Sequence, residues 1–149
     1  MKTWSGLYAM VWLAFLELLI AVDPRPPSWW IFVHAGLGAL LIGLGAWNLT
    51  SVRATAAPGR TKRTVRATLG LLILLAVLGV LLWANVGKST NVLLGYSVWD
   101  VIHVLHVVNA LAVLAQAASA ATAFDMWEEK EFERTTPPGV IPPPPGPLA

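Results

Sequence analysis

The stretch ATLGLLILLAVLGVLLWAN, from Ala67 to Asn85, contains no charged residue and decides the class of this protein. A bilayer core of about 30 Å needs roughly 20 mostly apolar residues in each helical span. Three further stretches meet the same test, at residues 4–22, 29–49 and 98–124. Because these stretches lack the alternation of barrel strands, only helices can span here. The sequence therefore predicts an all-α, integral membrane four-helix bundle.

The composition of the chain agrees with this class. Of the 149 residues, 56% are hydrophobic and 12% are charged, which is unlike a soluble domain. The first apolar stretch contains Glu17 and ends in Asp-Pro-Arg-Pro-Pro rather than in a small-residue cleavage site. We therefore expect a retained helix there, not a signal peptide. The chain has no cysteine, so thiolate metal sites, iron–sulfur clusters and Cys-attached heme are excluded.

The basic residues predict how the helices are oriented. In an up-down-up-down topology, one side of the membrane carries Lys2, Arg53, Arg60, Lys62, Arg63, Arg66, Lys130 and Arg134, and the other carries Arg25 and Lys88. The positive-inside rule then places both termini in the cytoplasm, in a multi-pass protein of the cell membrane. Topology and attraction to anionic lipid explain the basic loop at 51–66, and nothing indicates nucleic acid.

The chain changes character after residue 124, so we divide it into a bundle at 1–124 and an extension at 125–149. Residues 125–134 are mostly charged and are expected to continue the last helix into the cytoplasm. Residues 137–147 are rich in proline and are expected to be polyproline II. This tail is either a loose end or a strap along another subunit of a membrane complex or of a homo-oligomer.

Four ionisable side chains lie inside the predicted spans, where such groups are costly and indicate function. They are Glu17, His34, His103 and His106, and Asn109 is a neutral polar companion. Counting at about 1.5 Å per residue places all four roughly 6 to 10 Å below the outer surface. Three different helices thus contribute ionisable groups to one layer of the membrane.

A layer of histidines and a carboxylate can bind a metal or a heme. Zinc or copper could be held by His34, one histidine of the last helix and Glu17. A porphyrin needs only one imidazole from each of two facing helices. Gly38 lies four residues after His34, and Ala110 lies four residues after His106. Each small residue therefore shares a helix face with its histidine and would leave room for a macrocycle. Small residues also allow close helix packing, but together with the level histidines they favour heme.

The histidine of the last helix that binds iron is expected to be His106, because it lies deeper and has Ala110 at the right offset. His103 is then expected to pair with Glu17 or with a heme propionate, or to meet lipid headgroups. For Glu17 the alternative is a neutral buried carboxyl held by a neighbouring helix. Asn109 is expected to hydrogen-bond between helices, and Asp100 to cap the last helix.

The pattern His-x-x-x-Gly at His34 and Leu-His-x-x-Asn-Ala around His106 resembles the four-helix heme-binding bundle of heme A synthase and of small membrane b-type cytochromes. The resemblance covers residues 1–124 as an arrangement and implies histidine ligands on the second and fourth helices. In heme A synthase, an arginine follows the helix-2 histidine and a glutamate precedes it by four residues. Here Ala35 and Trp30 stand at these positions, and Glu17 is a candidate replacement for the acid.

Three functions remain as hypotheses. The first is a heme b subunit for electron transfer in a respiratory or quinone-linked complex, with quinone as a possible second cofactor and with Glu17 and His103 handling its protons. The second is an enzyme or assembly factor of heme A or oxidase maturation. The third is an accessory subunit without a cofactor, which docks on its partners through the extension and tail. We rank electron transfer first and leave open whether the chain is an enzyme.

Overall fold

The computed structural model describes residues 2–21, 27, 29–93 and 95–135. The elements are α1 (Thr3–Ala21), α2 (Trp30–Arg53), α3 (Gly59–Trp83), β1 (Asn91–Leu93), β2 (Tyr96–Ser97) and α4 (Val98–Thr135). All four helices are long and apolar enough to cross a membrane. The predicted all-α class and the four candidate spans are therefore confirmed, and the only strands in the described residues form a two-stranded antiparallel hairpin between α3 and α4.

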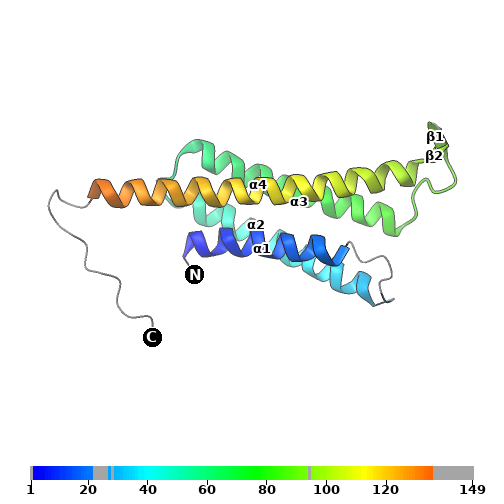
Figure 1. The fold of residues 1–149 in the computed structure, drawn as a ribbon, viewed down its shortest axis with the longest axis horizontal. Helices are drawn as coiled ribbons and strands as arrows, with labels where there is room; N and C mark the ends of the chain where they lie inside the picture. Colours follow the sequence, from blue (N-terminus) through cyan, green and yellow to red (C-terminus); the bar gives the residue numbers. More distant parts are fainter. Residues whose placement is uncertain (1, 22–26, 28, 94, 136–149) are drawn as a thin grey trace.

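The four helices lie side by side along the long axis of the molecule (Figure 1). Helix α1 packs on α2 and α4, and α3 also packs on α2 and α4. The residues 54–58 that join α2 to α3 lie toward one end, which we call the connection end. The strands β1 and β2 lie at the other, which we call the hairpin end. All four helices therefore share one interior that runs between these two ends.

Two helices are longer at the connection end than the apolar stretches indicate. Helix α3 begins at Gly59 rather than at Ala67, and α2 ends at Arg53 rather than at Leu49. The added turns of α3 are helical because one of their faces is buried, through Thr61 and Val65 at helical spacing. The basic side chains of this segment lie off that face, so they mask the helical period in the sequence.

The core of the bundle lies toward the connection end. Its most buried large side chains are Leu7, Met10, Leu41, Val52, Val65, Val113 and Phe124. Helices approach closely there, since a Cβ atom on Gly45 would lie 2.9 Å from Cδ1 of Leu72. Asn48 is also buried, and its Nδ2 donates a hydrogen bond to the backbone oxygen of Gly6 at 2.9 Å. This half of the interior is closely packed and ties α1, α2 and α3 together.

The start of α4 at the hairpin end is fixed by reciprocal capping. The backbone nitrogen of Ser97 donates to Oδ2 of Asp100 at 2.8 Å, and Oγ of Ser97 accepts a hydrogen bond from the backbone nitrogen of Asp100 at 3.2 Å. Nε1 of Trp99 donates to the backbone oxygen of Leu82 at 3.2 Å, which holds α4 against the end of α3. Asp100 thus caps the last helix, as predicted.

Helix α4 is 38 residues long and continues without a break beyond residue 124 to Thr135. The predicted charged continuation of the last helix is therefore helical. Nζ of Lys62, from α3, donates to the backbone oxygen of Thr55 at 2.7 Å and closes the neighbouring α2–α3 connection. The proline-rich tail, residues 136–149, lies outside the described residues.

Candidate functional site

Three helices direct ionisable side chains toward one cavity in the interior. Glu17 comes from α1, His34 from α2 and His106 from α4, and the cavity has a volume of about 90 Å³. Its other lining residues are Ala14, Leu18, Ala21, Leu41, Leu75, Val107, Ala110 and Val113. The cavity lies nearer the hairpin end than the packed core does, and its walls are apolar apart from the three ionisable groups.

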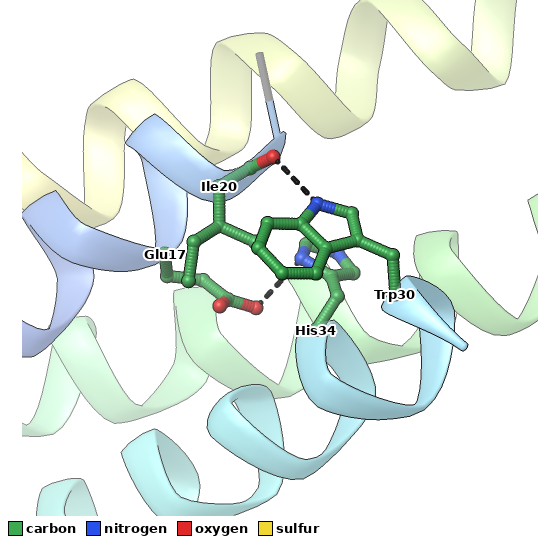
Figure 2. A network of polar contacts seen from close by, with 4 residues as sticks. All are labelled: Glu17, Ile20, Trp30 and His34. Carbon is green, nitrogen blue, oxygen red and sulfur yellow. Dashed lines mark hydrogen bonds and ion pairs between the residues drawn. The ribbon is translucent and has the colours of Figure 1, made fainter. Parts of the chain in front are cut away.

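Glu17 and His34 are in contact across the α1–α2 interface. Oε1 of Glu17 lies 2.8 Å from Nδ1 of His34, and the Glu17 side chain is 9% exposed (Figure 2). The contact has the distance of an ion pair, but the ring nitrogen does not have the alignment of a hydrogen bond. Nε1 of Trp30 donates to the backbone oxygen of Ile20 at 3.1 Å and joins the same two helices. The end of α1 and the start of α2 therefore hold the carboxylate against the imidazole.

His34 and His106 face each other although α2 and α4 are not packed neighbours in the bundle. Their ring centroids lie 6.2 Å apart, and the ring planes are inclined by 60°. Since Glu17 lies at Nδ1 of His34, Nε2 is the nitrogen of that ring left for a ligand. The two imidazoles thus form a pair across the interior, in the layer of the bundle that the sequence predicts.

Helix α3 supplies the wall beside His106. A Cβ atom on Gly79 would lie 3.3 Å from Cε1 and 3.9 Å from Nδ1 of His106. Leu75, one helical turn earlier, lines the cavity. Sequence reasoning missed both residues because α3 carries no polar side chain at this level. The signal that could have found Gly79 is a glycine inside an apolar helix, where glycine costs roughly 1 kcal/mol relative to alanine.

Unpaired polar atoms gather around the cavity. In the described part of the chain, the buried side-chain nitrogen and oxygen atoms without a hydrogen-bond partner are Oε2 of Glu17, Nδ1 of His34, Oδ1 of Asn48 and Nδ1 of His106. Three of these four atoms belong to residues that line the cavity, and one of the three, Nδ1 of His34, lies 2.8 Å from Oε1 of Glu17. Buried polar atoms without a protein partner are rare, and they are explained by strain, by a bound water or ion, or by a catalytic role. The cavity is therefore the candidate functional site.

The remaining predicted site residues divide between the cavity and its surroundings. Ala110 lines the cavity, and a Cβ atom on Gly38 would lie 4.0 Å from Oε1 of Glu17. Asn109 donates from Nδ2 to the backbone oxygen of Leu71 at 2.9 Å, which is the expected bond between helices. His103 is exposed and packs edge-on against Trp99 at a centroid distance of 5.2 Å. Glu17 contacts His34 rather than His103.

A metal ion held by protein ligands alone does not fit this arrangement. Within residues 2–21, 27, 29–93 and 95–135, no group of three or more His, Cys, Asp or Glu side chains is placed to hold a metal ion. Glu17, His34 and a histidine of α4, which the sequence offered as an alternative zinc or copper site, therefore do not form such a group in the described residues. The site offers two imidazoles, those of His34 and His106, with ring centroids 6.2 Å apart.

The distance between the two imidazoles can be compared with that of two ligands of one metal ion. Two imidazole nitrogens that point at one metal ion from opposite sides, each about 2 Å from it, place their ring centroids about 6 Å apart, and the centroids of His34 and His106 lie 6.2 Å apart. The cavity of about 90 Å³ is smaller than the few hundred Å³ of an ordinary cofactor pocket. A macrocycle therefore requires side chains such as Leu41, Leu75 and Val113 to turn aside.

Comparison with protein-family models, with curated protein sequences and with solved structures finds no match to this chain. The functional assignment therefore depends on the residues around the cavity.

Proposed function

We propose that this chain is a membrane-embedded b-type heme protein that transfers electrons within a respiratory or quinone-linked complex. The observation that carries the proposal is the pair of imidazoles, with ring centroids 6.2 Å apart, between His34 of α2 and His106 of α4.

Each residue at the cavity has a role in this proposal. His34 and His106 would hold the heme iron through their imidazoles. Glu17, 2.8 Å from Nδ1 of His34, orients that ring and raises its basicity. Residues such as Leu41 and Val113 give the site aliphatic walls. The heme, when bound, accepts and donates single electrons at a potential set by its axial ligands and by burial.

The proposal places the four helices in the membrane in an up-down-up-down arrangement. All four are long and apolar enough to cross, and large apolar side chains such as Trp12, Phe32 and Val104 are exposed on the outside of the bundle. By the positive-inside rule, the basic residues of α3 and of the extension support a cytoplasmic location for the connection end and for both termini. The site then lies in the outer half of the membrane, where quinone and extracytoplasmic donors have access.

The helical extension of α4 and the tail at 136–149 are the parts that we assign to partner subunits of the host complex or to a second copy of the chain. The extension carries both signs of charge, and its Met126 and Phe132 side chains are exposed. Exposed apolar side chains among charges are typical of a surface that contacts another protein.

A second candidate function is a heme A synthase-like enzyme or an oxidase assembly factor. The contact between Glu17 and His34 favours it, because Glu17 brings a carboxylate to the helix-2 histidine. The alanine at position 35 disfavours it, because that position holds an arginine in the enzyme that the sequence resembles.

The experiment that tests the proposal is a reduced-minus-oxidised visible spectrum of the detergent-purified full chain, with a pyridine hemochrome assay. We expect sharp α-bands and about one b-type heme per chain. An a-type or intermediate hemochrome would instead support the maturation enzyme. A chain that stays colourless after heme is added would overturn both and leave the cofactor-free accessory subunit.

A further inference from the structure

One oxygen of the buried Glu17 carboxylate has no partner. Oε1 lies 2.8 Å from Nδ1 of His34, whereas Oε2 is buried without a hydrogen-bond partner in the described part of the chain. On α4, which lines the same cavity, Nδ1 of His106 is also buried and without a hydrogen-bond partner. Two helices therefore bring polar atoms that lack protein partners to one cavity.

The cavity has the size and the lining to bind water. Its volume of about 90 Å³ corresponds to about three water molecules, since each takes about 30 Å³ in the liquid. An apolar cavity stays dry, whereas buried polar atoms without protein partners hold water. Glu17, His34 and His106 supply polar atoms here, and the other lining residues are aliphatic. Water is therefore expected beside these three side chains.

The cavity also separates its three ionisable side chains from other charges. Among the described residues, no further ionisable side chain lines the cavity, and the residue that α3 contributes to the lining is Leu75. His103 is exposed outside the cavity, and Asp100 accepts its hydrogen bonds from Ser97 at the start of α4. A proton that enters the cavity can therefore reside on one of three side chains, from α1, α2 and α4.

We propose that the cavity binds water and that this water carries protons between the Glu17 carboxyl group and the His106 imidazole. In the transfer, a proton leaves Oε2 of Glu17 for the adjacent water, and another proton leaves the water for Nδ1 of His106. Glu17 becomes a carboxylate beside His34, His106 becomes an imidazolium, and the water is regenerated. The net charge of the cavity is unchanged, which favours the transfer because net charge is costly in an apolar interior.

This proton path goes beyond the proposed function and does not rest on it. The water fits the cavity at its observed volume, whereas a heme requires residues of the cavity wall to turn aside. A heme held by His34 and His106 would replace the water, so the proton path belongs to the chain before heme enters. Among the described residues, Glu17 is the only ionisable residue that is fully buried, so the path does not continue into the packed core.

The test is infrared difference spectroscopy of the full chain, purified without added heme, between acidic and neutral pH. Spectra in ordinary and in heavy-oxygen water identify the O–H bands of bound water, and Glu17→Gln identifies the carboxyl band of Glu17. A matched pair on α4 compares His106→Leu, which removes the proton acceptor, with His103→Leu outside the cavity. Circular dichroism and size exclusion report whether each variant folds.

We expect the unaltered chain to show a protonated-carboxyl band, absent from Glu17→Gln, and water bands that shift in heavy-oxygen water. His106→Leu should lose these water bands and shift the carboxyl band, because an apolar side chain replaces the group that binds the water. His103→Leu should match the unaltered chain.

A second pair keeps every ionisable side chain and changes only the space for water. Ala110→Leu places a larger side chain in the cavity lining, and Ala115→Leu adds the same group at an exposed position of α4. We expect Ala110→Leu to lose the water bands and Ala115→Leu to keep them. If His106→Leu fails to fold, this pair decides the proposal.

Two outcomes would overturn the proposal. In the first, the unaltered chain shows no bound-water band. In the second, the water and carboxyl bands are the same in folded His106→Leu and Ala110→Leu as in their controls. Heme per chain, measured separately after heme is added, tests the proposed function. A chain that binds heme but shows no bound water would overturn the proton path alone, and a chain with bound water that binds no heme would overturn the proposed function alone.

Discussion

The two halves of the bundle interior use polar residues in opposite ways. Toward the connection end, Asn48 is fully buried among close-packed aliphatic side chains, and its Nδ2 donates to the backbone oxygen of Gly6 although its Oδ1 has no hydrogen-bond partner. Toward the hairpin end, Glu17, His34 and His106 leave three buried atoms without hydrogen-bond partners around a cavity. A polar group that binds another helix contributes to stability, whereas a polar group left facing a cavity is available for a ligand.

Removing either imidazole at the hairpin end should have the largest effect of the changes considered, and the quantity affected is the amount of heme that the protein retains. We expect His34→Ala and His106→Ala each to abolish heme retention, because the iron loses an axial ligand whose ring faces its partner at 6.2 Å. His103→Ala should keep the heme and alter only its spectrum or potential, since His103 is exposed outside the cavity. Heme per chain after purification measures the effect. Equal heme content in all three variants would contradict the assignment of His34 and His106, rather than His103, as the heme ligands.

Neutralising the carboxylate should have a graded effect. Glu17→Gln keeps the size of the side chain but removes the charge beside Nδ1 of His34. Loss of such an outer partner costs about 10- to 100-fold in affinity for the bound group. We also expect a higher reduction potential, because a less basic imidazole stabilises ferric iron less. Heme titration and a redox titration measure both effects, and Gln116→Glu, away from the cavity lining, is the control for a charge change within a span.

Truncating the buried amide should weaken the connection half and leave the site intact. Asn48→Ala removes the hydrogen bond from Nδ2 to the backbone oxygen of Gly6, and such a hydrogen bond contributes about 0.5–1.5 kcal/mol. We expect a lower midpoint of unfolding in detergent and unchanged heme per folded chain. Asn109→Ala, which loses the bond to Leu71, should behave in the same way. A loss of heme from folded Asn48→Ala would mean that the two halves are not separable.

Replacing a glycine of α2 by alanine should have the smallest effect on the stability of the bundle. Gly45 and Gly43 provide a comparison, because they lie on the same helix in different surroundings. A Cβ atom on Gly45 would lie 2.9 Å from Cδ1 of Leu72, and one on Gly43 would meet nothing within 4 Å. We expect Gly45→Ala to destabilise the bundle by about 1 kcal/mol through overpacking. Gly43→Ala should be neutral or stabilise by up to about 1 kcal/mol, because it raises helix propensity. Denaturant unfolding of both variants in one detergent makes the comparison.

The class of fold could be predicted from the sequence, but the rotation of the helices could not. Apolar length is enough to identify four spans, and counting residues from their ends places Glu17, His34 and the α4 histidines in one layer. Depth does not say which way a side chain points. For this reason the sequence left Glu17 between His103 and a neighbouring helix as partners, and the packing of α1 on α2 places it on His34.

The parts that the sequence did not reveal depend on contacts between helices. The first turns of α3 resemble a polar loop because Arg60, Lys62 and Arg63 hide the buried spacing of Thr61 and Val65. Gly79 carries no chemical signal, and only its distance to His106 gives it a meaning. Asn48 is similar to Asn109 in the sequence, and only the structure shows what each of them binds.

The uninterrupted length of α4 has a mechanical consequence. From Val98 to Thr135 it contains neither proline nor glycine, the residues at which helices most often kink. His106 and Trp127 therefore belong to one stiff rod and are separated along its axis by about 30 Å. If a change at His106 rotated α4 about its axis, the charged residues near Thr135 would rotate by the same angle. A partner bound at that end of α4 would then respond to a change at the cavity without contacting the cavity itself.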